Sequence, residues 1–104
     1  MLGTYAASGE IDIATAPDFA VDLRECIERA DEVLIGIDCS GVTFVDSAGY
    51  HALVDATAYA ALRGRSLEIR NPPPSVARLI RLCDVGGELR VEPSPEGAAP
   101  LVLR

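Results

Sequence analysis

Hydrophobic positions along the chain change between a spacing typical of strands and one typical of helices. Thr4–Ile11 alternates weakly and predicts a first strand. Thr15, Pro17 and Asp18 supply a hydroxyl cap, a first-turn proline and an early acid, which together predict a helix start. Apolar residues then recur every three or four positions and predict one buried helix face. That face comprises Phe19, Leu23, Cys26, Ile27 and Ala30.

A second strand and helix follow. Val33–Ile37 is a continuous apolar run and predicts a central strand covered on both faces. We expect a loop at Asp38–Gly41, a short apolar segment at Val42–Val45, and then a helix capped by Asp46 and ended by Gly64. The buried face of this helix is expected at Tyr50, Leu53, Val54, Thr57 and Ala61.

The last part of the chain predicts one more strand–helix–strand unit. Ser66–Arg70 alternates and predicts a strand, and Asn71–Pro74 forms a stiff connector. The helix after it is expected to end at Gly86–Gly87, before a last strand at Glu88–Glu92. Its buried face is expected at Val76, Leu79, Ile80 and Cys83.

Strands that alternate with helices predict a single α/β domain with a mostly parallel sheet of four to five strands and about three helices. We place this domain at residues 1–92. Residues 93–104 form a linker-like tail in which only Leu101–Leu103 has side chains that can dock on the domain. With 104 residues, 49% of them hydrophobic, the chain is long enough to bury one core.

Charge and cysteine content exclude several classes of protein. The net charge of −7 argues against a nucleic-acid partner, because binding nucleic acid needs a basic patch. Apolar runs of about five residues are too short to span a bilayer, and no signal sequence is visible, so we expect a cytoplasmic protein without membrane insertion. Cys26, Cys39 and Cys83 lack CxxC spacing and predict reduced thiols. With His51 as the single histidine, we expect no metal site and no cofactor.

The segment Asp38–Leu53 carries the most chemical information. A strand leads through a turn into a helix whose first turn bears a hydroxyl, Ser47. Such a helix end presents unpaired N–H groups and favours a phosphate or a partner's carboxylate. Gly49 removes side-chain bulk and lets another backbone approach closely. The pattern alone favours a plainer interpretation, in which Asp46 caps the helix and Ser47 is a solvated first-turn residue.

Two motifs resemble a known family. The stretch Asp38–Gly49, written D-x-S-x-V-x-F-V-D-S-x-G, resembles the signature of the STAS family, the anti-sigma-factor antagonists. The turn Gly9–Asp12, with the sequence GEID, resembles the family's first conserved turn. The proline-bearing entry to the third helix and its glycine stop also fit, so the similarity covers Ser8–Val91.

The resemblance implies a partner-switching module and not an enzyme. Such proteins bind an anti-sigma factor, often a serine kinase with a GHKL-type fold, and so release a sigma factor. Phosphorylation of a hydroxyl at the start of the second helix abolishes this binding, since a phosphate adds about −1.5 to −2 charge to the contact surface. Family members often carry two hydroxyls before the glycine. Ala48 occupies the second position here, which leaves Ser47 as the candidate phosphoacceptor.

The resemblance also implies where a partner binds. The site centres on the start of the second helix and is flanked by the preceding segment. Its residues are Asp46, Ser47, Ala48, Gly49 and His51, with Ser40, Gly41 and Thr43 flanking. The N-terminus before Gly9 is shorter than is usual in the family, and the tail lacks the final amphipathic helix of free-standing members. We therefore expect poorly covered sheet edges, which favour a homodimer or an added partner strand.

Other functions compete with this interpretation. Ser47, His51 and Asp55 recur at every fourth position, so one helix stripe carries the residue types of a hydrolase triad. This stripe lies opposite the expected core face and points to solvent, so we instead expect a binding surface there, joined by Tyr59. No phosphate-binding glycine motif supports a nucleotide site. Two other binding roles stay open: a subunit of a lipid-transport ABC complex and a scaffold component of a stress-signalling assembly.

Overall fold

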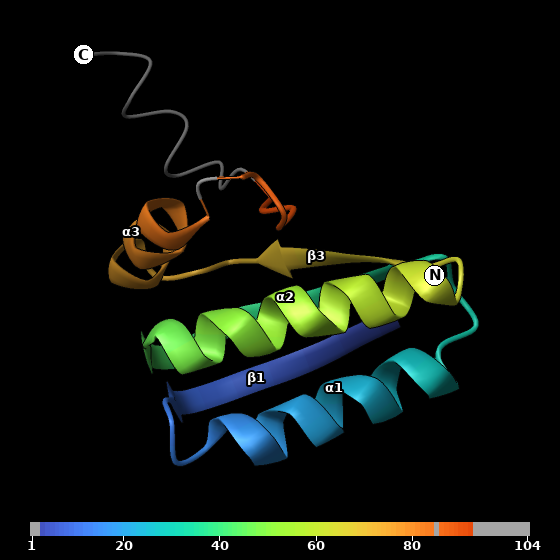
Figure 1. The fold of residues 1–104 in the computed structure, drawn as a ribbon, viewed down its shortest axis with the longest axis horizontal. Coiled ribbons are helices and arrows are strands. Elements are labelled where there is room, and N and C mark those ends of the chain that lie inside the picture. The colour runs from blue at the N-terminus through green and yellow to red at the C-terminus, as the bar shows by residue number, and fades with distance from the viewer. Residues whose placement is uncertain (1–2, 85, 93–104) are drawn as a thin grey trace.

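Three strands and three helices alternate in the computed structural model, which describes residues 3–84 and 86–92 (Figure 1). Both neighbouring strand pairs are parallel, in the order β1-β2-β3. The elements are β1 (Gly3–Ile11), α1 (Ala16–Arg29), β2 (Leu34–Val45), α2 (Ser47–Leu62), β3 (Ser66–Arg70) and α3 (Pro74–Cys83). The expected α/β class with a parallel sheet and three helices is confirmed, although the described residues form three strands and not four or five.

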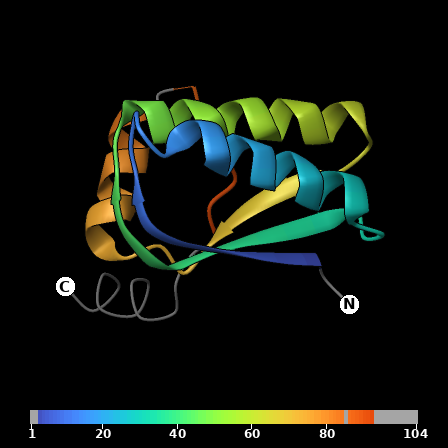
Figure 2. The same cartoon turned by 90° about the horizontal axis from the view of Figure 1, so that it is seen from below.

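Helices α1 and α2 lie side by side over one face of the sheet, and α3 sits at one end (Figure 2). The core fills the space between this helix pair and the sheet. Its largest fully buried side chains are Leu23, Ile27, Ile35, Ile37, Leu53, Ile69, Ile80, Val42 and Val76. On α1 the expected face is largely confirmed, since Phe19, Leu23 and Ile27 are buried while Cys26 is half-buried.

The buried face of α2 differs from the expectation. Tyr50 and Leu53 are buried as expected, but Thr57 is half-buried and Ala61 is exposed. A row of small residues takes their place in the core: Ala52, Ala56 and Ala60. Because α2 packs against α1 as well as against the sheet, small side chains are needed on the side where the two helices approach each other.

Strand β2 runs without interruption through Asp38–Gly41, so the expected loop there is wrong. The pairing with β1 advances from Ala6↔Asp38 to Ser8↔Gly41, which leaves one extra residue in β2. The register shifts a second time between Gly9↔Val42 and Glu10↔Phe44, again with one extra residue in β2. Each extra residue turns the following side chains over to the other face. The buried positions of β2 are therefore Ile35, Ile37, Cys39, Val42 and Val45, and the turn-like polar residues lie on the outer face.

The expected last strand at Glu88–Glu92 is also wrong. In its place a single parallel bridge joins Ile69 to Val91. The carboxylate of Asp84 accepts hydrogen bonds from the backbone N–H groups of Glu88 and Leu89 at 3.0 and 3.1 Å. These bonds hold the start of the segment against the end of α3, so only its end, at Val91, pairs with β3.

The outer face of the sheet is not covered by α1 or α2. Strand β2 is central, and the two-sided cover expected for it is only partly present: on the outer face Leu34 is half-buried, and Gly36 is buried by the side chain of Arg70. Arg70 in turn pairs with Glu68 at 2.8 Å and with Glu92 at 3.8 Å. The proposed tail at residues 93–104 lies outside the described residues.

Candidate functional site

The carboxyl ends of β1 and β2 meet at the start of α2. The backbone N–H of Asp46 donates to the carbonyl oxygen of Ile11 at 3.1 Å. The side-chain Oδ1 of Asp46 accepts from the N–H of Gly49 at 3.1 Å. This bond satisfies one of the free N–H groups of the first turn. The expected cap and the expected helix start are both confirmed.

Gly49 is buried, and the backbone that approaches it belongs to the same chain. A Cβ at this position would lie 2.6 Å from the carbonyl oxygen of Ile11 and 3.0 Å from Cγ1 of Val45. Any side chain would force α2 away from both strands. The close approach expected at Gly49 therefore serves the packing of α2 on the sheet.

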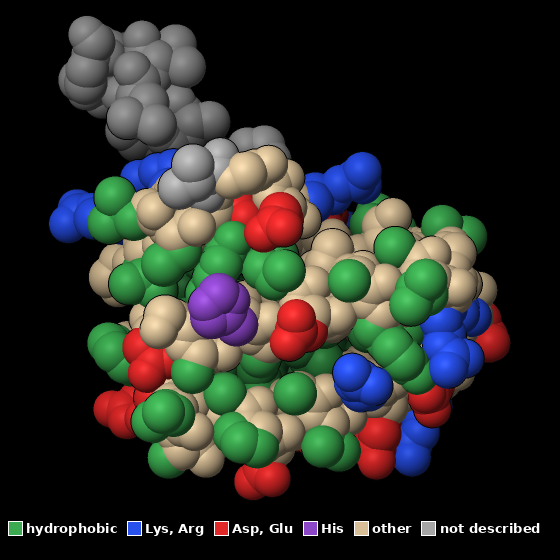
Figure 3. Space-filling model, viewed as in Figure 1, with side chains coloured by type: hydrophobic (Ala, Val, Ile, Leu, Met, Phe, Trp, Pro, Cys, Tyr) green, Lys and Arg blue, Asp and Glu red, His purple; other side chains and the backbone are tan. Residues whose placement is uncertain are grey.

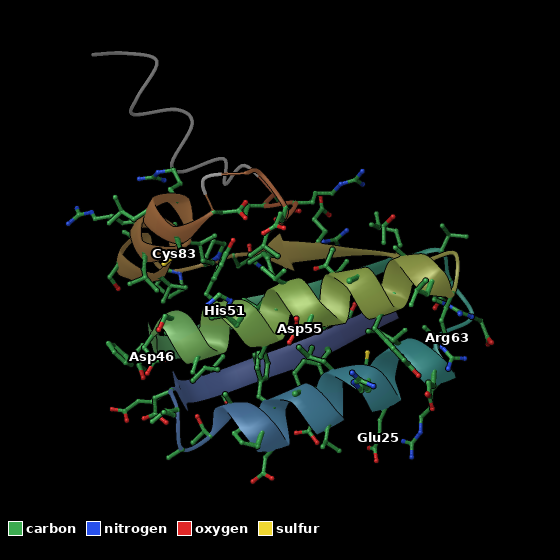
Figure 4. The ribbon with its side chains drawn as sticks, in the orientation of Figure 1. Glu25, Asp46, His51, Asp55, Arg63 and Cys83 are labelled. Carbon is green, nitrogen blue, oxygen red and sulfur yellow. The ribbon has the colours of Figure 1, made fainter. Side chains whose placement is uncertain are left out.

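Ser47 and His51 are exposed on the first turns of α2, while Ala48 is half-buried. Figure 4 shows Asp46, His51 and Asp55 following one another along this helix. Figure 3 shows the imidazole, in purple, on the open surface of this face among hydrophobic and acidic side chains. The structure thus brings together Asp46, Ser47, Ala48, Gly49 and His51 around one helix start.

The flanking residues of the expected site lie further away. Ser40, Gly41 and Thr43 are exposed on β2 and belong to the strand, not to a loop beside α2. Ser40 lies on the order of 20 Å along the strand from the start of α2. Its backbone N–H donates to Oδ1 of Asp38 at 3.1 Å, and this bond lowers the pKa of that carboxyl. Thr43 is the nearest of the three and lies three residues before Asp46 along the chain.

Tyr50 joins the site to the end of α3, a contact for which the sequence contains no local signal. Its hydroxyl donates to Oδ1 of Asp84 at 2.7 Å, which raises the pKa of Tyr50 because the carboxylate disfavours the phenolate. Burial raises the pKa of Asp84, but the hydrogen bonds from Tyr50, Leu89 and Glu88 outweigh burial and lower it. The first turn of α2 is therefore fixed to two strands and to α3.

An exposed apolar side chain beside the site also escaped the sequence analysis. Ile13 is 79% exposed in the turn between β1 and α1. Oδ1 of Asp12 accepts from the N–H groups of Ala14 and Thr15 at 2.9 and 3.0 Å, and Thr15 Oγ1 donates to the carbonyl of Glu10 at 2.8 Å. These bonds hold the turn in one conformation. Ile13 therefore has a fixed position, two residues after Ile11, which contacts Asp46.

Tyr59 does not extend the exposed stripe of α2. Its hydroxyl donates to Glu28 of α1, and its ring lies between Arg24 and Arg63 at 4.6 and 4.8 Å. Arg63 also pairs with Glu28 at 3.5 Å. Tyr59 therefore joins α1 to α2, and the binding role expected for it is not supported by this arrangement.

The hydrolase alternative lacks its hydrogen-bond relay. Ser47, His51 and Asp55 are all exposed, and no hydrogen bond joins them in the structure. A working triad needs a serine–imidazole bond and a buried acid. The stripe can therefore present polar groups to a partner, but it does not assemble the relay.

The remaining chemistry of residues 3–84 and 86–92 is sparse. No group of three or more potential metal ligands occurs in this part of the chain. Within the same residues, no helix is both long and apolar enough to cross a membrane. The three cysteines are free, as expected, and burial raises the pKa of Cys39 to about 12. That thiol is held neutral in the core.

Comparison with known proteins gives the same fold. The chain resembles a putative anti-sigma factor antagonist from Thermotoga maritima at 18% identity, covering 97% of this chain and 86% of that one, with a TM-score of 0.73. It resembles the unphosphorylated anti-sigma factor antagonist SpoIIAA at 15% identity, covering 97% and 87%, with a TM-score of 0.62. The STAS domain of a SulP transporter from Vibrio cholerae gives 21% identity, 98% and 80% coverage, and a TM-score of 0.67.

At these identities the solved structures establish the fold and leave the function open, since antagonists and transporter domains share it. A protein-family model adds a match to the sequence itself. It is described as "Mlab, STAS domain" and matches residues 4–92, which is nearly all of the described chain. The chain therefore belongs to the STAS family.

Proposed function

We propose that the chain is a protein-binding module of the anti-sigma-factor-antagonist type, which sequesters an anti-sigma factor of the GHKL serine-kinase type. The start of α2 is the binding surface, and phosphorylation of Ser47 releases the partner. One observation carries the proposal: an exposed hydroxyl occupies the first residue of a capped helix that is anchored on three sides. The proposal includes a cytoplasmic location and a role in transcription regulation.

The position of Ser47 suits a switch that acts on the partner and leaves the fold intact. Ser47 is exposed, so a kinase can reach its hydroxyl. A phosphate at a helix N-terminus is favoured by the free N–H groups and the helix dipole, so α2 stays folded. The added charge of about −1.5 to −2 lies beside Asp46 and repels a partner selected for the unmodified surface.

Ala48 restricts the switch to a single hydroxyl. The side chain at position 48 is half-buried and carries no acceptor. The next two residues, Gly49 and Tyr50, are buried. Within the first turn of α2, a phosphate can therefore be accepted at Ser47 alone.

Affinity capture from the native host tests this proposal. The wild type, Ser47→Ala and Ser47→Glu are used as baits, with Ser75→Glu as a matched control. Ser75 is also an exposed serine in the first turn of a helix, α3, so this variant adds the same charge elsewhere. We expect a GHKL-type kinase on every bait except Ser47→Glu. Equal capture by Ser47→Glu and Ser75→Glu would refute the switch.

A second candidate is a subunit of a lipid-transport ABC complex. Ala48 favours it, because a subunit that stays in its complex needs no phosphoacceptor and position 48 carries no hydroxyl. Capture of a transporter ATPase by all four baits alike would support this candidate. Capture of large assemblies of other STAS proteins would instead indicate a stress-signalling scaffold.

A further inference from the structure

The two edges of the sheet are covered to different extents. Along β3, the N–H of Ile69 donates to the carbonyl of Arg90 and its carbonyl accepts from the N–H of Glu92, both at 2.8 Å. On the other side, β1 is the outermost strand, and no described segment pairs with its free edge. One edge is thus partly closed by the chain itself, and the other is open in the described residues.

The unpaired groups on this edge can be assigned from the strand's alternation. The carbonyl of Ile11 faces β2, because it accepts from the N–H of Asp46. The carbonyl of Glu10 faces the opposite way, because it accepts from Thr15 Oγ1. Gly9 has a positive φ of 76°, so regular alternation cannot be counted through it. Within one strand, residues whose side chains lie on the same face also point their backbone groups to the same edge. The side chains of Tyr5 and Ala7 pack on the core as that of Ile11 does, so the backbone groups of Tyr5 and Ala7 also face β2. The outward N–H and C=O groups therefore belong to Thr4, Ala6 and Ser8.

The open edge carries little of the usual protection against strand pairing: its one charged residue, Glu10, lies next to the end of the strand, and the extra residues at the two register shifts belong to β2. Natural edge strands are protected by charged side chains, prolines, bulges or short length. Strand β1 is nine residues long, and residues 3–9 contain neither a charge nor a proline. The covered edge, in contrast, carries Glu68, Arg70 and Glu92. In a chain of net charge −7, this uncharged stretch is a distinct feature.

We propose that the β1 edge binds an extended segment of a partner protein by strand addition. The recognised chemistry is a row of backbone donors and acceptors that pairs with Thr4, Ala6 and Ser8. The surface is separate from the start of α2, and the proposal does not depend on the role of Ser47.

Nearby carboxylates favour basic side chains in the added strand. The hydroxyl of Tyr5, on β1, donates to Oδ2 of Asp22 at 3.3 Å, which places this exposed carboxylate over the β1 side of the sheet. Asp18 is exposed one turn earlier on the same side of α1. An incoming strand with lysine or arginine side chains on its helix-facing side would meet both acids. The bound segment is therefore basic.

The same acids argue against a second copy of this chain. A symmetric pair of β1 strands would run antiparallel about a two-fold axis and would bring each Asp22 toward its equivalent. The two α1 helices would then face each other with like charges. A foreign basic segment avoids this repulsion.

A titration followed by NMR tests the proposal. The ¹⁵N-labelled chain is titrated with a capped peptide of alternating lysine and valine, and with a matched peptide of alternating glutamate and valine. We expect saturable shifts of the amides of Thr4, Ala6 and Ser8 with the lysine peptide. We expect binding of the glutamate peptide to be at least tenfold weaker. Shifts that map to other elements, or equal binding of both peptides, would overturn the proposal.

Two pairs of variants locate the contact. Ala6→Pro removes an outward N–H without removing a bond to β2, whereas Ala6→Thr keeps that N–H. We expect Ala6→Thr to bind the lysine peptide and Ala6→Pro to lose it. Should Ala6→Pro fail to fold, the variant Asp22→Asn tests the proposal. We expect Asp22→Asn to reduce the preference for the lysine peptide over the glutamate peptide several-fold. The control Asp55→Asn is expected to leave this preference unchanged. An unchanged preference in Asp22→Asn would refute the basic segment.

Amide exchange and the mass in solution of the free protein test whether the β1 edge is open. The proposal requires the amides of Thr4, Ala6 and Ser8 to exchange rapidly with solvent in the monomer. Their protection together with a doubled mass in solution would show that a second copy occupies the edge. Their protection in a monomer would show that the chain covers its own edge. Either result would overturn the proposal.

Discussion

At the scale of single residues, the start of α2 is fixed by contacts that leave Ser47 free. Asp46 closes the first turn, and Gly49 lets that turn rest directly on Ile11 and Val45. Both residues face inward or along the backbone, while Ser47 faces solvent. The hydroxyl is thus presented on a rigid support, which lowers the entropy lost when a partner binds it.

Gly49→Ala is predicted to destabilise the fold by about 1–3 kcal/mol, the usual cost of forcing extra volume into a packed site. The new Cβ would lie 2.6 Å from the carbonyl oxygen of Ile11, and this backbone atom cannot move aside freely. Urea denaturation measures the change in the free energy of unfolding. The control is Gly86→Ala, where the added Cβ meets only Glu88 Cγ at 3.8 Å. Equal stability of the two variants would contradict this account of Gly49.

Residue-level sequence analysis predicted the cap and a close backbone approach at Gly49, but it did not identify the backbone that approaches. Asp46 is recognisable because capping depends on residues three positions apart. The contact of Gly49 with Ile11 joins residues far apart in the sequence and leaves no local pattern. For the same reason the bond from Tyr50 to Asp84 could not be foreseen.

At the scale of elements, a partly buried hydrogen bond couples α2 to α3. The hydroxyl of Tyr50 donates to Asp84, and the same carboxylate holds the two backbone N–H groups that follow α3. These bonds favour the ionised form of Asp84, so its pKa in the folded state lies below the ordinary value of 3.8. A carboxyl whose pKa is lower in the folded than in the unfolded state stabilises the folded state at pH values above its ordinary pKa.

Tyr50→Phe is predicted to lower the melting temperature at neutral pH and to have less effect in acid. In the wild type, ionised Asp84 stabilises the folded state fully at pH values above its ordinary pKa of 3.8. This stabilisation is lost as the pH falls through the lower pKa that Asp84 has in the folded state. Without the tyrosine hydroxyl, one of the bonds that favour the carboxylate is missing. Thermal melts of both proteins from neutral pH downward measure the difference. A constant difference at every pH would contradict the coupling.

The sequence pattern predicted the three helices and β3 because local periodicity specifies them. It failed in β2, where Asp38, Ser40 and Gly41 have the composition of a turn. Pairing with β1 holds this segment extended, whereas β3 pairs with β2 only as far as Asp38. The extra residues keep the apolar side chains of β2 inward. Such tertiary pairing overrides local preference.

At the scale of the whole molecule, the fold offers two separate surfaces. The carboxyl ends of the strands present the start of α2, and the side of the sheet presents the open edge of β1 (Figure 1). A domain with two such surfaces can hold one partner through its edge while it exchanges another at α2. The strand count was overestimated because the segment after α3 is held by Asp84 and touches the sheet at one bridge.

The most direct test of the switch is to incubate the chain with its captured kinase and ATP. Intact mass and peptide mapping then identify the modified residue, and calorimetry compares the affinity of the kinase for both forms. We predict one phosphate on Ser47, a loss of binding after modification, and no modification of Ser47→Ala. A phosphate at another residue, or full affinity of the phosphorylated chain, would contradict the proposed function.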